Sequence, residues 1–284
     1  MSAGNAGNAV TLELIAQDAA AVRVAASIGA ARVELCQALA LGGLTPSLGT
    51  IEAAVQAAAE APASSEASAS SEASASSGAD RVGVHVLIRP RGGGFQYTAD
   101  EVAVMAADVR AAVAAGAAGV VIGCLDEAGR FDLDGMRRLR DAAGSAGVAA
   151  HRAIDVSADP LAALDALIGL GVERVLTSGA APTALAGADT LRAFVERAEG
   201  RIVVMAGGGV TAADAAGILA SGVRDLHFSA KRTIAGDAGG VSMGSAGSGV
   251  GDYEVADAAI AREIAEAAHA AAASFGSTTG GAAR

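Results

Sequence analysis

The fold is decided by RIVVMAGGGVTAADAAGILASGVRDLHFS, residues 201–229. This stretch begins with a β-branched run, turns through three consecutive glycines at residues 207–209, and continues into an Ala-rich segment. After Gly222 it ends in a second short apolar run. β-branched residues favour strands, Ala favours helices, and a glycine typically follows the last turn of a helix. Thr211 belongs to the residue types that cap helix starts, so the stretch predicts a strand, a helix and a second strand.

The same unit repeats along most of the chain. Successive β-branched runs start roughly 20 to 37 residues apart once one Ser-rich segment is set aside. The predicted strands begin near Thr11, Ala31, Val82, Gly119, Val148, Val172, Arg201 and Arg224. Eight such units close most simply into a single (β/α)8 TIM barrel of the α/β class, which we place at residues 11–269. An open doubly wound sheet is the alternative, although residues 15–18 lack its G-x-G-x-x-G loop.

One segment stands apart from this pattern. Residues 61–79 contain the hexamer SSEASA twice in tandem and no branched apolar residue. Such a composition cannot bury enough apolar surface to offset the entropy of ordering the chain. We therefore expect a disordered insertion here, between the second helix and the third strand. The same argument predicts a flexible N-terminus at residues 1–10 and a disordered tail at residues 270–284.

Composition narrows the class of function. Of the 284 residues, 52% are hydrophobic but only 2% are aromatic, so aliphatic side chains must build the core. The formal net charge of −11 argues against binding to nucleic acids or to anionic membrane surfaces. Charged residues interrupt every apolar stretch before the ~18–20 residues that a membrane span needs. Two cysteines make no disulfide framework, so we expect a cytoplasmic protein.

Polar side chains gather where the predicted strands end, and barrel enzymes keep their active sites at that end. Each residue alone is most simply a structural ion pair, but their common position predicts a functional set. Arg89 and Arg91 suit oxyanion binding, with an ion pair to Glu13 or Glu34 as the alternative. The candidates for acid–base catalysis are Glu13, Glu34, His151 and Asp155. The candidates for substrate or anion binding are Arg89, Arg91, Arg152, Ser178, Gly207, Gly208, Gly209, His227 and Ser229.

This set suits acid–base chemistry on a small anionic substrate. Glu13 or Glu34 would act as general base or acid, with His151 as its partner. Asp155 would orient either His151 or Arg152. The glycines at residues 207–209 precede a predicted helix, whose N-terminal amides favour a phosphate or a carboxylate, although a plain tight turn is the simpler alternative.

The metal-binding potential of the sequence rests on two cysteines. The chain holds no Cys-x-x-Cys, His-Glu-x-x-His or Asp-x-Asp-x-Asp motif. Cys36 and Cys124 fall on the second and fourth predicted strands. Two soft thiolates could hold Cu(I) if the fold brings them together. A buried free cysteine is otherwise a small hydrophobic residue.

Several longer stretches resemble the CutC family, whose members are named for copper homeostasis. The matching stretches are ARVELC (residues 31–36), GGLTPSLG (42–49), IRPRGGGFQY (88–97), HRAID (151–155), ERVLTSG (173–179) and RIVVMAGGGV (201–210). With the segments between them, they cover nearly the whole chain apart from the insertion and the termini. The resemblance implies a cytoplasmic (β/α)8 barrel that forms a homodimer or a larger homo-oligomer. It also implies copper handling, with Cu(I)-binding cysteines.

The sequence departs from the family pattern at one cysteine. Members of the family commonly carry Glu-x-Cys at the end of the first strand, where this chain has Ile15 at the Cys position. Cys36 is the remaining family cysteine, and Cys124 stands where a small residue usually follows Gly123. Two hypotheses result: a copper-homeostasis protein that binds Cu(I), or a barrel enzyme acting on a small phosphate- or carboxylate-bearing substrate. A scaffold without a ligand would leave the charged strand ends without a purpose.

Overall fold

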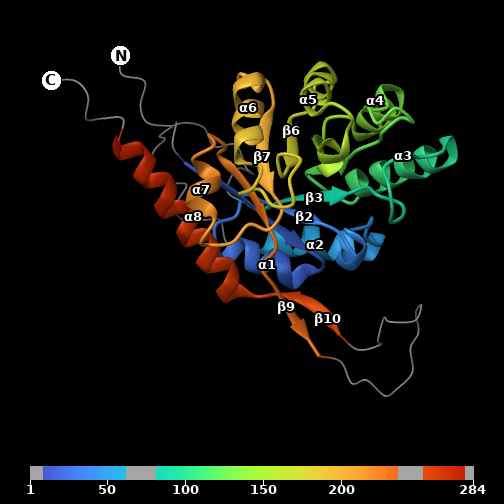
Figure 1. The fold of residues 1–284 in the computed structure, drawn as a ribbon. Coiled ribbons are helices and arrows are strands. Elements are labelled where there is room, and N and C mark those ends of the chain that lie inside the picture. Colours follow the sequence, from blue (N-terminus) through green and yellow to red (C-terminus); the bar gives the residue numbers. More distant parts are fainter. Residues whose placement is uncertain (1–8, 62–80, 236–251, 279–284) are drawn as a thin grey trace, which may run out of the picture.

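Eight parallel strands close into one barrel in the computed structural model, which describes residues 9–61, 81–235 and 252–278 (Figure 1). The strands are β1 (Thr11–Ala16), β2 (Arg32–Leu35), β3 (Gly83–Leu87), β4 (Gly119–Ile122), β5 (Gly147–Ala150), β6 (Arg174–Thr177), β7 (Val203–Gly207) and β8 (Asp225–Phe228). They pair in chain order, and β1 also pairs with β8. The predicted TIM barrel is confirmed, and this closing pair excludes the open doubly wound sheet.

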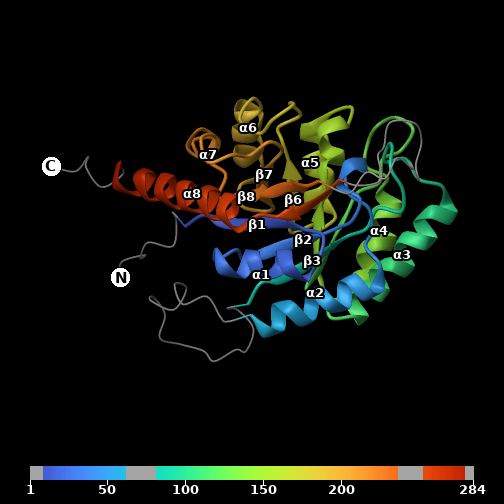
Figure 2. The ribbon, with the colours of Figure 1, turned by 90° about the horizontal axis from the view of Figure 1, so that it is seen from below.

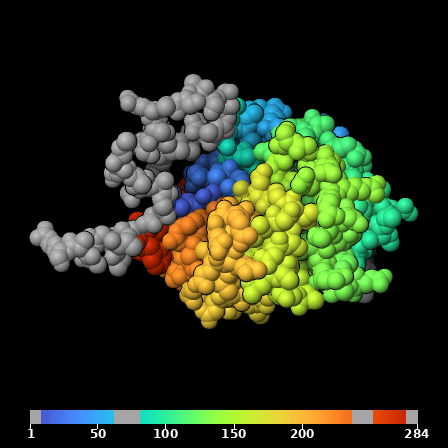
Figure 3. Space-filling view, turned by 90° about the horizontal axis from the view of Figure 1, so that it is seen from above, coloured from blue at the N-terminus to red at the C-terminus, as the bar shows by residue number. Residues whose placement is uncertain are grey.

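Helices surround the barrel and connect its strands. They are α1 (Ala19–Ser27), α2 (Leu48–Glu60), α3 (Ala99–Ala114), α4 (Leu133–Ala143), α5 (Pro160–Gly169), α6 (Ala188–Ala198), α7 (Ala215–Leu219) and α8 (Ala258–Thr278). Figure 2 shows the long helix α8 beside the barrel, and it packs against α1 and α7. Successive units lie side by side, so the colours pass from blue through green and yellow to orange across the surface (Figure 3). None of the helices in the described ranges combines the length and apolar character that a bilayer crossing demands.

The main core lies between the outer faces of the strands and the helices. Strand β1 illustrates the alternation, because Leu12 and Leu14 pack outward in this core while Glu13 and Ile15 face the barrel interior. Aliphatic residues dominate the core, as the low aromatic content predicts, and Phe194 is the largest of the fully buried side chains. The barrel interior holds buried polar side chains such as Glu13 beside a small apolar cluster of Cys36, Leu87, Val121 and Ala149.

Glycines and caps set the helix ends largely as the sequence predicts. Gly29, Gly116 and Gly171 follow helices α1, α3 and α5 with φ values of +69°, +94° and +70°. Asp159 caps α5, which begins with Pro160. The predicted cap at Thr211 is wrong, because its hydroxyl bonds Asp214 and α7 begins only at Ala215. The glycines at residues 207–209 consequently do not lead directly into a helix.

Two elements near the C-terminus differ from the expectation. An antiparallel pair, β9 (Lys231–Ile234) and β10 (Tyr253–Ala256), stands between β8 and α8. Helix α8 runs to Thr278, so the tail predicted from residue 270 is wrong for residues 270–278, where the Ala-rich sequence favours a helix. The rest of that tail, residues 1–8 of the predicted N-terminal segment and residues 62–79 of the predicted insertion lie outside the described residues.

Candidate functional site

A cavity of about 260 Å³ lies at the carboxyl ends of the barrel strands. Part of its wall is apolar, with Ile15 from β1, Leu87 from β3 and Leu176 from β6. Its polar lining comprises Glu34, Cys36, Arg89, His151, Arg152, His227 and Ser229, together with Gly208 and Gly209. All of these polar positions are candidates from the sequence, so strand alternation and the barrel rule are sufficient to bring them together.

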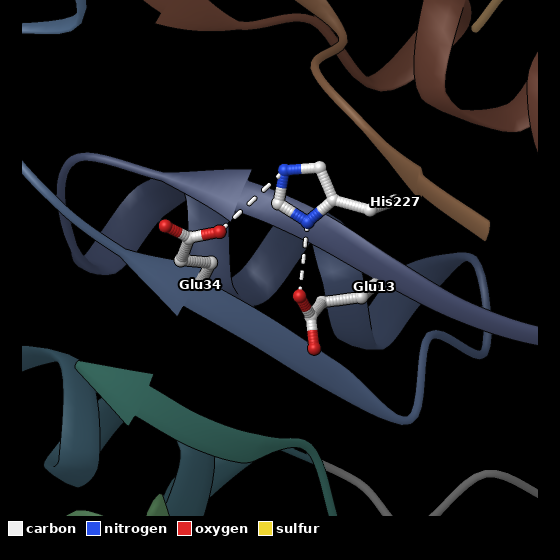
Figure 4. Close-up of side chains that lie close together, drawn as sticks. All are labelled: Glu13, Glu34 and His227. Atoms are coloured by element: carbon white, nitrogen blue, oxygen red, sulfur yellow. Dashed lines mark hydrogen bonds and ion pairs between the residues drawn. The ribbon is translucent and has the colours of Figure 1, made fainter. Parts of the chain in front are cut away.

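A row of buried polar side chains forms the floor of the cavity and continues beneath it. His227 Nδ1 lies 2.9 Å from Glu13 Oε1, and His227 Nε2 lies 3.6 Å from Glu34 Oε2. The imidazole therefore stands between two carboxyl groups (Figure 4). Arg32 Nε donates to the second oxygen of Glu13 at 3.0 Å. The strand register produces this row, because Glu13 is the neighbour of both Arg32 on β2 and His227 on β8.

The two glutamates of this row have opposite protonation tendencies. Burial works to raise the pKa of Glu13, but the hydrogen bond from His227 and the positive charges of His227 and Arg32 outweigh it and lower the pKa to about 2. Burial raises the pKa of Glu34 to about 7, against the attraction of His227. Burial opposes the charged form of His227, yet its bond to Glu13 and the nearby carboxylates raise its pKa. Glu13 is thus a fixed carboxylate below the cavity, and Glu34 can exchange a proton at its floor.

His151 presents an unused hydrogen-bond donor in the cavity wall. Its Nδ1 accepts from the backbone N–H of Ala153 at 3.2 Å, so the proton of the neutral ring is on Nε2. That Nε2 is buried and has no hydrogen-bond partner among the described residues. Burial and the charge of Arg89 lower the pKa of His151 to about 3, which keeps the ring neutral. Phe95 packs on this ring with its centroid 4.7 Å away.

The two arginines predicted to hold an oxyanion perform other tasks. Arg89 donates to the carbonyl oxygens of Leu41, Gly43 and Gly93 at 2.7–2.8 Å and so ties together the loops after β2 and β3. Arg91 is absent from the cavity lining, and its ion-pair partner is Glu101 of α3. The alternative ion pairs with Glu13 or Glu34 are not found, because Arg89 is engaged by backbone carbonyl oxygens of two loops and Arg91 by Glu101.

Arg152 is held at the cavity by a cluster around Asp155. Arg152 Nε donates to Asp155 at 2.7 Å, and its Nη2 donates to the hydroxyl of Ser178 at 2.7 Å. Asp155 also accepts from the backbone N–H of Ser178, so it orients Arg152 and not His151. The remaining Nη1 has no hydrogen bond to another described residue. A Cβ at Gly208 would lie 3.2 Å from this Nη1, so the glycine leaves room for the guanidinium.

The two thiols lie on opposite sides of the barrel wall. Cys36 is buried in the inner cluster with Leu87, whereas Cys124 belongs to the outer core between strands and helices. Burial raises the pKa of both thiols, that of Cys124 to about 12. The three described residues that could share a metal ion are Glu13, Glu34 and His227, without a cysteine. Two protein thiolates are therefore not brought together for Cu(I).

The sequence reasoning missed three residues that shape this interior. His85 is buried on β3, and its ring occupies the space that a side chain at Gly119 would need. Gly123 makes the same room for His151, because a Cβ there would lie 2.3 Å from its Cε1. The available signal was the pair of glycines bounding a short buried strand, since a glycine in a strand marks a close approach.

Comparison of the sequence with known proteins identifies one family. The family model described as "CutC family" matches residues 10–232. A CutC family protein from Xylella fastidiosa (strain Temecula1 / ATCC 700964) is 42% identical over 259 residues, which are 91% of this chain and 88% of the relative. The human protein named "Copper homeostasis protein cutC homolog" is 41% identical over 206 residues, 72% of this chain and 67% of the relative.

Solved structures show the same likeness. The crystal structure of a CutC protein from Streptococcus agalactiae has a TM-score of 0.67 and 31% identity, covering 77% of this chain and 97% of that chain. A thiamine phosphate pyrophosphorylase from Pyrococcus furiosus shares only the fold, with a TM-score of 0.54 and 15% identity over 94% of this chain and 99% of that one. The family match spans most of the barrel and agrees with both curated relatives. This chain therefore belongs to the CutC family.

Proposed function

We propose that this chain acts in copper homeostasis, as its relatives' names indicate, and that it binds Cu(I) as cargo in the cavity at the carboxyl end of the barrel. The observation that carries the proposal is the position of Cys36, which lines this cavity. Cys36 also lies in the part of the chain that the family model matches. Thiolate sulfur is a ligand type that selects Cu(I) over harder metal ions. In this proposal copper is bound as cargo and not as a resident cofactor.

Among the described residues, the cavity offers Cu(I) one protein thiolate, that of Cys36. Cys124 lies in the outer core, so it cannot join Cys36 without a rearrangement of the barrel wall. The carboxylates on the cavity floor are hard oxygen donors, which suit other metals better than Cu(I). Cys36 is therefore the residue on which copper binding should depend, and a second soft ligand has to come from outside the protein's own cysteines.

Anaerobic titration with Cu(I), with a little 2-mercaptoethanol as the reductant, tests this proposal. We expect wild type and Cys124→Ser to bind one equivalent, measured by competition with a chromophoric chelator. Cys36→Ser should bind at least about 100-fold more weakly, which corresponds to about 2.7 kcal/mol. Cys124→Ser is the matched control because it removes the other buried thiol. Binding by Cys36→Ser at wild-type affinity, or none by wild type, would contradict the proposal.

The cellular setting belongs to the same proposal. Two free buried cysteines are compatible with a reducing compartment, and we infer a cytoplasmic protein. The net charge of −11 supports the absence of a nucleic-acid or membrane partner. A homodimer or larger homo-oligomer remains the expectation from the family.

The alternative, an acid–base enzyme for a phosphate- or carboxylate-bearing substrate, has less support. Its expected oxyanion ligand Arg91 lies outside the cavity lining, and Arg89 is engaged by carbonyl oxygens. The glycines at residues 207–209 do not begin a helix. The row containing Glu34 and His227 is the part of that hypothesis which the geometry preserves.

A further inference from the structure

Glu34 is a buried carboxyl group without a hydrogen bond. It is 6% exposed, and no hydrogen bond joins its oxygens to another residue in the described ranges. Its contact in the buried row is His227 Nε2, which lies 3.6 Å from Glu34 Oε2. A good hydrogen bond spans only about 2.7–3.2 Å. Because a buried polar group without a partner costs free energy, a ligand that binds this carboxyl group is favoured.

The same two groups are open to the cavity. Glu34 and His227 both belong to its lining. Neither the Glu34 oxygens nor His227 Nε2 is sealed from the cavity, in contrast to His151 Nε2. The carboxyl group and the imidazole face each other across a short gap (Figure 4). One small ion can therefore reach both groups at once.

The spacing of these groups matches that of two ligands on one metal ion. Ligand atoms about 2.0–2.2 Å from a tetrahedral ion lie roughly 3.3–3.6 Å from each other. The 3.6 Å between Glu34 Oε2 and His227 Nε2 agrees with this separation. Ligand atoms of Glu13, Glu34 and His227 all lie within 4.8 Å of one another. Carboxylate oxygen and imidazole nitrogen are ligands that Zn²⁺ accepts.

Glu13 holds the imidazole in the orientation that such a site requires. His227 Nδ1 lies 2.9 Å from Glu13 Oε1, and Arg32 Nε donates to the other oxygen of Glu13. A histidine that binds a metal typically donates its second ring N–H to a carboxylate, which fixes its tautomer and its orientation. With Nδ1–H bonded to Glu13, the lone pair of Nε2 is available on the side of Glu34.

We propose that Glu34 and His227 bind one divalent metal ion of the Zn²⁺ class at the floor of the cavity. Glu13 is the positioning residue for His227 and does not touch the ion. A four-coordinate ion completes its shell with water or another small oxygen ligand from the cavity. The site uses no thiolate, so it stands apart from the proposed copper function, and either can fail without the other.

Titration of the metal-free protein with Co²⁺, a spectroscopic substitute for Zn²⁺, tests the site. We expect one equivalent of Co²⁺ to give the visible absorption of a four-coordinate ion, and one equivalent of Zn²⁺ to remove it. Glu34→Gln and His227→Gln should each weaken Co²⁺ binding by at least about 100-fold, and Glu13→Gln by about 10–100-fold, the usual effect of losing a carboxylate that supports a ligating histidine.

Two further measurements keep the test decisive. His269→Gln removes the exposed imidazole of α8 and should bind Co²⁺ as wild type does. If the variants of the buried row do not fold, the Co²⁺-loaded wild type itself decides. Its ¹H NMR spectrum should contain one strongly shifted, exchangeable N–H signal, that of His227 Nδ1–H. Its near-ultraviolet spectrum should lack the charge-transfer absorption of a cobalt–thiolate bond.

Several results would overturn the inference. They are no binding of Co²⁺ or Zn²⁺ by wild type, loss of binding in His269→Gln, and wild-type affinity in a folded Glu34→Gln. A cobalt–thiolate absorption, or a spectrum without the shifted N–H signal, would do the same. The anaerobic Cu(I) titration of Cys36→Ser is a separate measurement, so the proposed copper function is judged independently of all these outcomes.

Discussion

The contribution of His85 to the free energy of unfolding depends on pH. Its ring is buried inside the barrel, and its Nδ1 has no hydrogen-bond partner in the described part of the chain. Burial lowers its pKa to about 4 from an ordinary 6.5, against the attraction of Glu13. Between those two pH values the unfolded chain binds more protons than the folded one. Stability linked to His85 is therefore complete above pH 6.5 and is lost as the pH falls toward 4.

We predict that His85→Gln flattens the acid side of the stability profile. At pH 5 the wild-type histidine should have lost about 2 kcal/mol relative to pH 7, an amount that glutamine cannot lose. Urea unfolding at pH 7, 6 and 5 measures the difference. His269→Gln, at an exposed position of α8, is the control and should follow wild type. An equal acid loss in wild type and His85→Gln would show that another group is responsible. His151, whose pKa is lowered further, to about 3, contributes an acid loss of at least similar size in both proteins.

The residues facing the barrel interior could be predicted, but their partners could not. Alternation along a strand decides which side chains point inward, so Glu34 and His227 were placed at one mouth from the sequence alone. Arg91 follows its strand just as Arg89 does, yet it bonds Glu101 because the loop turns it toward α3. Loop geometry of this kind has no periodic signal in the sequence.

Strand β4 is the element that leaves space for its neighbours' histidines. Gly119 accommodates the ring of His85 from β3, and Gly123, just beyond the end of β4, accommodates His151 after β5. Neither glycine has a positive φ, so the requirement comes from side-chain space and not from the backbone. The absence of a side chain at these two glycines therefore leaves space for two imidazole rings inside the barrel.

We predict that Gly123→Ala displaces His151 and destabilises the barrel by about 1–3 kcal/mol, the usual cost of overpacking. The reason is the 2.3 Å distance from the added Cβ to His151 Cε1. Gly169→Ala at the end of α5 is the control, because its added Cβ would meet no atom within 4 Å beyond its chain neighbours and its own helix backbone. Urea unfolding of both variants measures the contrast, and similar stabilities would refute this account of β4.

Regular elements were predictable where local sequence and packing agree. The eight strands could be found from their β-branched runs, and three helix ends from their glycines. The hairpin of β9 and β10 could not, because KRTI and YEVA are short and lie apart in the sequence. Thr211 does not cap a helix, because its hydroxyl donates to the carboxylate of Asp214. Competing side-chain partners of this kind are settled only in the folded chain.

At the scale of the whole molecule, the barrel should not need residues 62–80. Helix α2 ends at Glu60 and β3 begins at Gly83, whereas α1 and β2 are joined by residues 28–31 alone. We predict that replacing residues 62–80 with Gly-Ser-Gly preserves a cooperative thermal melt and Cys36-dependent copper binding, since a shorter connection lowers the entropy cost of closing the loop. A variant with these residues scrambled is the control. A non-cooperative melt in the shortened chain alone would assign them a structural role.

The pairing of β1 with β8, which closes the barrel, determines when the contact between Glu13 and His227 can form during synthesis. Glu13 and His227 are 214 positions apart, yet they bond directly across this pair of strands. At ~5–20 residues per second of synthesis, the glutamate emerges about 10–40 s before its histidine. Until then β1 has an unpaired edge, the kind of surface that invites unwanted strand pairing. The row of Glu13, Glu34 and His227 is thus completed only after β8 has been synthesised.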